Sequence, residues 1–521
     1  MGEALPKKVV LLRPAMLIPH LTFSGLTVPP LGLAYIASYL REKRHEVILI
    51  DAVGEAIGQY EPYRANYVLH GLRIDQILER IPGDTEVIGV SCMFSHEFPI
   101  YRDWIQRLKD RFPKAHILAG GEHVTALPKE TLEQCPALDL LVLGEGEGTI
   151  LDVVESDFTL ESLEKIPGIA WMSGKNLVNS SARRARIRAI DEISKPAWDL
   201  VPLENYWKHG MGLGVNRGKS MPLLATRGCP YQCTFCSSPL MWTTRWAARN
   251  PVEVVDEMEQ YIREYGVENF DFYDLTAIVH KKWIVEFCEL LLNRKIDVTY
   301  QLPSGTRSEA IDREVAKLLY RSGCRNMTYA PESGSDRMLS LIKKRVHIGK
   351  MLESMRGCVE EGLNIKANLI VGFPGEAWGD LWRTFRFLLR MAIVGVHDVT
   401  IQPYSAYPGT ELFDGLRKDK KITLDDEFYF ALANLADLAQ SSSWSENFSS
   451  RTTFWYRTLG MLAFYGVSYS LRPWRLLRTL FNLAKGKQET RLERALNDIF
   501  TRRKSSLPRK VAEAVACPPY V

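Results

Sequence analysis

Arg227-Gly228-Cys229-Pro230-Tyr231-Gln232-Cys233-Thr234-Phe235-Cys236 is the stretch on which the interpretation of the whole chain depends. Its three cysteines are spaced CxxxCxxC, a spacing that lets a tight loop present three thiolates to one face of a metal cluster. A [4Fe–4S] cluster has four irons, so Cys229, Cys233 and Cys236 would leave one iron open to a further ligand. A zinc site and three unrelated buried cysteines are the alternatives. Zinc sites usually add a distant second cysteine pair, which this sequence lacks.

The cluster loop resembles that of the radical S-adenosylmethionine (SAM) enzymes, whose open iron binds the amino and carboxylate groups of SAM. Further motifs follow at the ends of predicted strands: Glu332-Ser333-Gly334, the run IVGFPGE that ends at Glu376, and YSAYPGTEL from Tyr404. Each motif alone is also ordinary turn chemistry. Together they imply SAM-binding residues at Phe235, Asp274, Glu332, Ser333, Gly372 and Glu376.

Length, cysteine content and net charge indicate how many domains the chain has, in which compartment it resides and which partners it does not bind. A chain of 521 residues predicts two to four domains. Its nine cysteines are odd in number and follow no disulfide pattern, which favours a reducing cytoplasm. The apolar run at Val9 is too short for a signal peptide and predicts a first strand. A net charge of only +4 argues against a nucleic-acid binder.

Residues 1–155 alternate between apolar runs and helical patterns, which predicts five βα units in a parallel, flavodoxin-like Rossmann sheet. Predicted strands are Val9 to Leu12, Val47 to Asp51, Val87 to Ser91, His116 to Ala119 and Leu138 to Leu143. Predicted helices are Leu31 to Glu42, Ile74 to Ile81, Ile100 to Phe112, Thr125 to Gln134 and Thr149 to Val154. In such a sheet the ligand lies outside the carboxyl ends of the strands.

The loops of this domain carry PPLGLAYIASYL, then GGEHVTA, then LVLGEGE, an order that resembles the cobalamin-binding domain of the B12-dependent radical SAM enzymes. The resemblance implies cobalamin contacts at Pro30, Leu31, Gly32, Ser91, Gly120, Gly121, Glu122, His123, Gly144, Glu145 and Gly146. The sequence has no DxHxxG motif, so cobalt is expected to lack a histidine ligand, with His96 and His123 as alternatives. A degenerate Rossmann scaffold without cofactor is the other interpretation.

The middle of the chain divides into a connection and a second α/β domain. Residues 156–222 lack a sustained period and contain the basic run Arg183 to Arg188 and a glycine-rich stretch at 210–214, which predicts a surface linker. Residues 223–415 alternate again, with six predicted strands, near residues 223–226, 269–274, 298–301, 326–329, 365–371 and 399–403. Six strands fit the partial (β/α)6 barrel that the radical SAM resemblance implies.

Residues 416–521 are predicted to be helical, aromatic and basic. From Arg451 onward there are fourteen Lys or Arg and four Asp or Glu. A helix lying on an anionic membrane or capping an apolar channel fits this pattern, and a solvated basic face of a packed helical domain is the alternative. Cys517 is expected to be inert, with a hydrogen-donating thiol as the alternative.

The resemblance implies an anaerobic enzyme that uses a [4Fe–4S] cluster, SAM and cobalamin. The first hypothesis is a methyltransferase acting on an unactivated carbon through a 5′-deoxyadenosyl radical and methylcobalamin. A second keeps the cofactors but cyclises, rearranges or oxidises an apolar substrate such as a tetrapyrrole, isoprenoid or lipid. A third is a non-catalytic protein on a dead cobalamin scaffold. Expected partners are a small apolar substrate, a flavodoxin or ferredoxin reductant and a membrane surface, but not nucleic acid.

Overall fold

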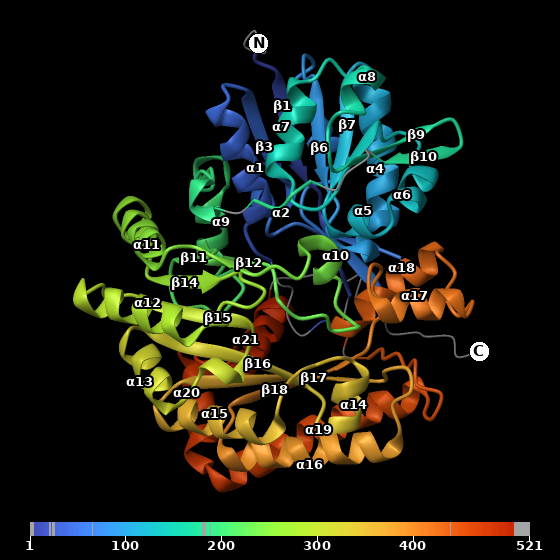
Figure 1. The fold of residues 1–521 in the computed structure, drawn as a ribbon. Coiled ribbons are helices and arrows are strands. Elements are labelled where there is room, and N and C mark those ends of the chain that lie inside the picture. The colour runs from blue at the N-terminus through green and yellow to red at the C-terminus, as the bar shows by residue number, and fades with distance from the viewer. Residues whose placement is uncertain are drawn as a thin grey trace.

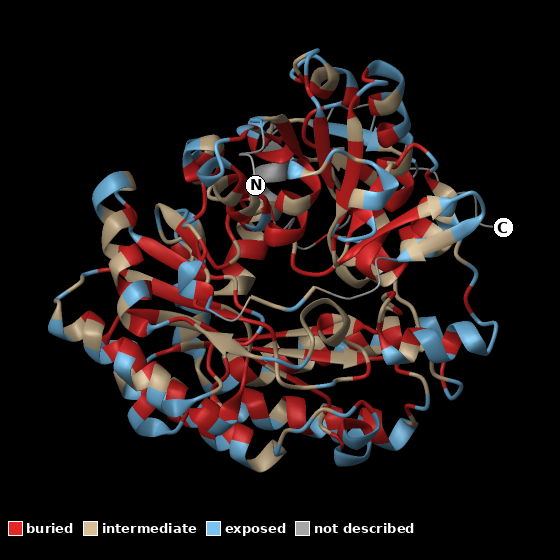
Figure 2. Cartoon of the chain, turned by 45° about the horizontal axis from the view of Figure 1, so that its top comes forward, coloured by how far each residue is buried: buried red, intermediate tan, exposed pale blue. Residues whose placement is uncertain are grey.

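The computed structural model describes residues 5–19, 22, 27–64, 66–179, 184–187, 189–437 and 439–504. Two sheets are stacked one above the other, each covered by helices (Figure 1). Buried residues follow the strands, and the exposed ones are concentrated on the outer helices and loops (Figure 2). Cys517 and the arginines at 183 and 188 lie outside the described residues.

The upper sheet has seven strands in the order β10-β9-β8-β7-β6-β1-β3. Five of them are parallel and confirm the predicted flavodoxin-like fold: β1 (Lys8–Arg13), β3 (Glu46–Asp51), β6 (Val87–Ser91), β7 (His116–Gly120) and β8 (Leu140–Val142). The connecting helices are α1 (Leu31–Glu42), α2 (Ala52–Glu55), α3 (Ile74–Leu78), α4 (Phe98–Arg111), α5 (Glu122–Ala126), α6 (Pro128–Gln134) and α7 (Glu147–Glu155). The helix predicted from Thr125 is two helices, because Pro128 cannot continue α5 and instead begins α6.

A small antiparallel sheet, β2-β5-β4, was not predicted. It consists of β2 (Met16–Pro19), β4 (Tyr60–Tyr63) and β5 (Tyr67–His70). Its strands have four residues each, too few for a period to show.

Residues 156–222 contain more regular structure than the lack of a period predicted. After α8 (Leu160–Leu163), a hairpin of β9 (Ile169–Ser173) and β10 (Asn176–Asn179) pairs antiparallel with β8 and extends the upper sheet. After α9 (Leu203–Lys208), the glycine-rich stretch lies against β14 (Asn269–Phe272), where Asp271 accepts hydrogen bonds from the Leu213 and Gly214 amides at 3.0 and 2.9 Å. The sequence did not predict these elements, because short strands and a glycine-rich segment have no amphipathic periodicity.

The lower sheet has six parallel strands in chain order, which confirms the predicted partial barrel. They are β11 (Ser220–Leu223), β14 (Asn269–Phe272), β15 (Thr299–Thr306), β16 (Cys324–Glu332), β17 (Asn364–Val371) and β18 (Asp398–Pro403). A two-stranded ladder of β12 (Thr226–Arg227) and β13 (Ala247–Ala248) frames the cysteine loop. The helices are α10 (Ser238–Trp242), α11 (Pro251–Tyr265), α12 (Lys281–Asn293), α13 (Arg313–Arg321), α14 (Asp336–Leu341), α15 (Ile348–Glu360) and α16 (Trp378–Val394).

Beyond the barrel the chain is helical, with α17 (Glu411–Lys418), α18 (Asp426–Ala431), α19 (Ser450–Leu471), α20 (Pro473–Ala484) and α21 (Arg491–Lys504). Arg494 of α21 donates to the Gly212 and Gly214 carbonyls, so this helix closes the amino end of the barrel together with the glycine-rich stretch. No helix in the described part of the chain is long and apolar enough to cross a membrane.

Helix α19 is fixed to the barrel by a buried arginine. Arg457 donates to the carbonyls of Ile401, Gln440 and Asp437 at 3.0, 2.9 and 3.1 Å. Its side chain therefore satisfies backbone acceptors on β18 and on the segment before α19, and it does not reach solvent.

We expect Arg457→Ala to lower stability by about 3 kcal/mol, because it leaves buried carbonyls without donors. The measurement is the apparent unfolding temperature of the full chain. Arg451→Ala, an exposed arginine on the same helix, is the matched control and should leave that temperature unchanged. Equal effects of the two substitutions would contradict this role of Arg457.

Candidate active site between the two sheets

The cysteine loop lies where the carboxyl ends of both sheets meet. It follows β11 of the barrel, and α10 just after it contacts α5 of the upper domain (Figure 1). Gly228 opens the loop with φ of +84°, and a side chain there would lie 2.3 Å from the Arg245 carbonyl oxygen. Only glycine fits this position.

The three loop cysteines are suited to a cluster. Cys229, Cys233 and Cys236 are partly buried free thiols within eight residues of chain, and the Thr276 hydroxyl lies 3.5 Å from Cys229 Sγ. Burial raises the pKa of Cys236 to about 12, so iron would have to displace its proton. Within the described residues, no three His, Cys, Asp or Glu side chains converge on a single-ion site. The thiolates of a [4Fe–4S] cluster bind different irons and need not converge on one point.

A buried ion cluster joins the loop to the upper sheet. Arg227, two residues before Cys229, pairs with Glu145 at 2.9 Å and Glu147 at 2.7 Å, and all three side chains are buried. Burial alone would lower the pKa of Arg227, but Glu147 and Glu145 hold it above its usual value. The predicted cobalamin residue Glu145 thus binds Arg227, and it also accepts from the Ile187 amide at 2.9 Å.

A second link is made by the GGEH loop. Glu122 accepts a hydrogen bond from Ser237, the residue after Cys236. Burial raises the pKa of Glu122, and the hydrogen bond from Ser237 opposes this shift. Gly121 has φ of +125°, and a side chain there would lie 2.6 Å from the Cys92 carbonyl oxygen. This glycine lets the loops after β6 and β7 touch each other.

The other predicted cobalamin residues lie at the same edge. They are Pro30, Leu31 and Gly32 at the start of α1, Ser91 and Gly120 at the ends of β6 and β7, and Gly144 and Gly146 before α7. A side chain at Gly32 would meet no atom within 4 Å, so the backbone there is open to a ligand. Met93 and Phe94, which the sequence did not single out, are 42% and 47% exposed in the loop after β6. This edge fits a large, partly apolar cofactor.

His123 is buried within the domain. Its Nδ1 lies 2.9 Å from Ser95 Oγ, its Nε2 lies 3.3 Å from Thr131 Oγ1, and the ring packs on Phe98 at 4.2 Å. Burial lowers its pKa to about 3. With both ring nitrogens in contact with hydroxyls, His123 is not placed to bind cobalt. His96 Nδ1 is also buried and has no hydrogen-bond partner among the described residues.

On the barrel side, Glu332 ends β16 with φ of +65° and pairs with Lys344 at 2.9 Å. Lys344 Nζ lies 6.0 Å from the ring centre of Phe235, which itself packs on Phe373. Burial alone would lower the pKa of Lys344, but Glu332 and Cys233 keep it raised. A paired carboxylate and ammonium beside the cysteine loop match the amino and carboxylate groups of a zwitterionic amino acid.

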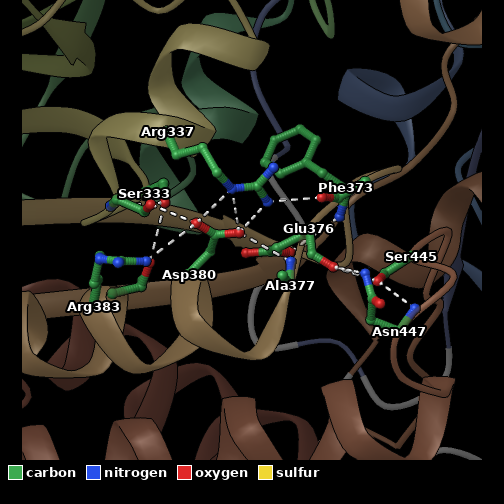
Figure 3. A network of polar contacts seen from close by, with 12 residues as sticks. Ser333, Arg337, Phe373, Glu376, Ala377, Asp380, Arg383, Ser445 and Asn447 are labelled. Carbon is green, nitrogen blue, oxygen red and sulfur yellow. Dashed lines mark hydrogen bonds and ion pairs between the residues drawn. The ribbon is translucent and has the colours of Figure 1, made fainter.

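Glu376 closes the turn after β17 (Figure 3). It accepts from the Gly372 and Phe373 amides at 2.6 and 3.2 Å, and its Oε1 is buried without a partner in the described structure. Gly372 has φ of +88°, which an L side chain rarely adopts, and a Cβ there would lie only 3.2 Å from Ser442 O. Burial raises the pKa of Glu376 to about 7.

Two predicted SAM residues hold the backbone. Asp274 accepts from Thr226 Oγ1 at 2.6 Å and from the Ala225 amide at 3.2 Å, and burial raises its pKa to about 6. Ser333 Oγ accepts from the Ser335 amide at 3.2 Å and lies 3.1 Å from Thr384 Oγ1. Both are buried and shape the strand ends rather than line an open surface.

The sequence missed several charged residues of this site. Lys344 and Arg307 belong to no recognisable sequence motif. The Arg307 guanidinium lies 3.7 Å from the Tyr231 ring centre. Arg227 lies two residues before Cys229 in the sequence, but the sequence does not show that it pairs with Glu145 and Glu147 of the upper domain. Asp380 is held by Arg337 and the Ala377 amide and braces the turn of Glu376 (Figure 3).

Comparison with known proteins agrees with this geometry. The B12 binding domain family matches residues 21–154, and the Radical SAM superfamily matches residues 223–388. An uncharacterized methyltransferase of Pyrococcus horikoshii is 29% identical over 392 residues, which cover 75% of this chain and 79% of that protein. The anaerobic magnesium-protoporphyrin IX monomethyl ester cyclase of Cereibacter sphaeroides is 27% identical over 401 residues, covering 76% and 61%.

The fold is shared with a solved structure of TsrM, a radical S-adenosylmethionine methyltransferase from Kitasatospora setae with cobalamin and a [4Fe–4S] cluster bound. The TM-score is 0.60 at 16% identity, and the alignment covers 80% of this chain and 75% of that chain.

We expect Glu376 to make stability depend on pH. Its folded pKa of about 7 exceeds the ordinary value of 4.5, so its contribution is fully present below pH 4.5 and is lost as the pH rises through 7. Glu376→Gln keeps an acceptor for the two amides and removes the titration. Between about pH 5 and pH 8 the apparent unfolding temperature should fall less in this variant than in the wild type. The exposed substitution Glu61→Gln should leave the wild-type slope, and an unchanged slope in Glu376→Gln would refute the assignment.

Proposed function

Because this chain is a cobalamin-dependent radical SAM enzyme, we propose that it methylates an unactivated carbon of a small-molecule substrate. The observation that carries the proposal is a direct contact between the cysteine loop and the edge of the upper sheet that carries the predicted cobalamin residues. Glu122 accepts a hydrogen bond from Ser237, and Glu145 pairs with Arg227. When bound, the cluster and SAM would supply a radical and cobalamin would supply a methyl group. The protein's own task is to hold these groups at one cavity.

The roles of individual residues follow from their contacts. Cys229, Cys233 and Cys236 would hold the cluster, and Glu332 with Lys344 would bind the amino and carboxylate groups of SAM. When SAM binds, each partner of this pair can exchange its protein contact for a charged group of the ligand. Phe235 would pack on the adenine, with Gly372 giving the backbone close access.

For cobalamin, we propose contacts from the open backbone at Gly32 and from the loops that contain Ser91, Gly121 and Gly144. Glu145 and His123 serve this site indirectly, since one binds Arg227 and the other is buried among hydroxyls. Cobalt would therefore lack a ligand from His123.

We propose an apolar substrate, because Met93, Phe94 and Leu275 are exposed apolar side chains at the carboxyl ends of β6 and β14. A reductant is required by this enzyme class, and we propose a flavodoxin or ferredoxin in the cytoplasm. The cyclase relative keeps a second candidate open, the radical closure of a ring on a similar substrate.

We expect Cys229→Ala, Cys233→Ala and Cys236→Ala each to abolish SAM cleavage in anaerobically reconstituted protein. The measurement is 5′-deoxyadenosine formation together with iron content. Cys288→Ala, at a buried cysteine outside the loop, should retain both. Cleavage that persists in any loop variant would contradict the cluster assignment.

Methylation and cyclisation are separated by the fate of the SAM methyl group. The loaded full chain is incubated with methyl-labelled SAM, reductant and candidate tetrapyrroles or lipids. We expect the label in the product, as detected by mass spectrometry. A product that forms without the label would favour the cyclase.

A further inference from the structure

Exposed apolar side chains gather on three helices at the outside of the barrel. Twenty large apolar residues of the described chain are exposed, and twelve of these lie on α16, α19 and α20. A protein that remains free in water seldom concentrates such residues on one surface, so this one marks an interaction site.

Helices α16 and α19 lie side by side with their starts together and their ends together (Figure 1). Tyr456 donates to the Leu381 carbonyl at 2.9 Å near their starts, and Arg472 donates to the Ile393 carbonyl at 2.9 Å near their ends. The buried residue Leu388 of α16 faces the barrel, and buried Phe464 of α19 does the same. The opposite sides of both helices therefore face outward together.

The outward sides carry tryptophan and leucine at helical spacing. On α16, Trp378 and Trp382 are 59% and 61% exposed. On α19, Trp455, Leu459 and Leu462 are 49%, 57% and 65% exposed. Residues separated by three or four positions share one side of a helix, so the exposed apolar residues named here share one side of each helix.

Helix α20 extends this surface beyond the end of α16. Arg475 donates to the Gly395 carbonyl at 2.8 Å and fixes the position of α20. Trp474, Leu477 and Phe481 are 61%, 68% and 55% exposed, at intervals of three and four residues. We call the outward surface of these three helices the α16–α19–α20 face.

The charge of this face has one sign. The three helices contain seven arginines and a single acidic residue, Asp380, which is buried and paired with Arg337. Arg386, Arg390 and Arg451 are exposed and form no ion pair with any described residue. A ligand surface that is apolar inside and negatively charged outside would satisfy both features.

We propose that the α16–α19–α20 face docks on the surface of an anionic lipid membrane. Tryptophan and leucine side chains enter the boundary between headgroups and acyl chains, while the arginines bind lipid phosphates. A second copy of the chain fits less well, because two such faces would bring unpaired arginines against each other. The inference does not depend on the reaction that the enzyme catalyses.

The test is sedimentation of the full chain with vesicles of phosphatidylcholine alone or with about 30% phosphatidylglycerol. We expect binding to the anionic vesicles, and weakening by about tenfold or more in the double variant Leu477→Ser with Phe481→Ser. The matched control is Leu160→Ser on α8, since Leu160 is 59% exposed and lies outside the face. This control should bind like the wild type.

A second variant, Arg386→Glu with Arg390→Glu, should lose the preference for anionic vesicles. Equal binding to both vesicle types, no binding of the wild type, or unchanged binding of the double variants would overturn the proposal. A concentration-dependent dimer that the leucine and phenylalanine substitutions abolish, without vesicle binding, would assign the face to a second copy instead. Vesicle binding and SAM cleavage are separate measurements, so either can fail without the other.

Discussion

The buried pairing of Arg227 with Glu145 and Glu147 is the interaction on which the arrangement of the two sheets depends. A guanidinium and two carboxylates that are removed from water are tolerated only while they remain paired. Arg227 belongs to the strand β12 that leads into the cysteines, whereas Glu145 lies in the loop after β8 and Glu147 begins α7. Moving the domains apart would separate Arg227 from both carboxylates and expose these buried charges to water, so the cysteine loop and the carboxyl edge of the upper sheet are held together before any cofactor binds.

The carboxyl ends of the strands in the two open α/β sheets together form one site. In each sheet the ligand region lies at the carboxyl ends of parallel strands. Here these ends face each other, and Glu122 with Ser237 adds a second contact between them. Positive φ at Gly121, Gly228 and Gly372 allows the loops to approach at distances that a side chain would prevent. Cofactors bound by segments that are far apart in the sequence can thus act on one substrate.

The sequence was sufficient for features that are local in the chain. Apolar alternation predicted the parallel strands of both sheets, and the spacing of the cysteines identified their loop. The sequence was insufficient where the partner of a charged side chain comes from a distant segment. Glu145 was expected to contact cobalamin, but in the structure it binds Arg227. Lys344, which pairs with Glu332, was not predicted as a site residue. A motif fixes the position of its glycines, but it does not show which charges a fold brings together. The β9–β10 hairpin was missed for a related reason, since strands of four or five residues that extend the edge of a sheet have too short a pattern.

The closure of the barrel by α21 has a consequence for the order in which the protein is made. Arg494 binds the carbonyls of Gly212 and Gly214, so the floor of the barrel requires residues almost 300 positions apart. During synthesis the upper domain and all six barrel strands emerge from the ribosome before this helix does. The nascent barrel therefore remains open at its amino end until α21 has been translated, long after its six strands.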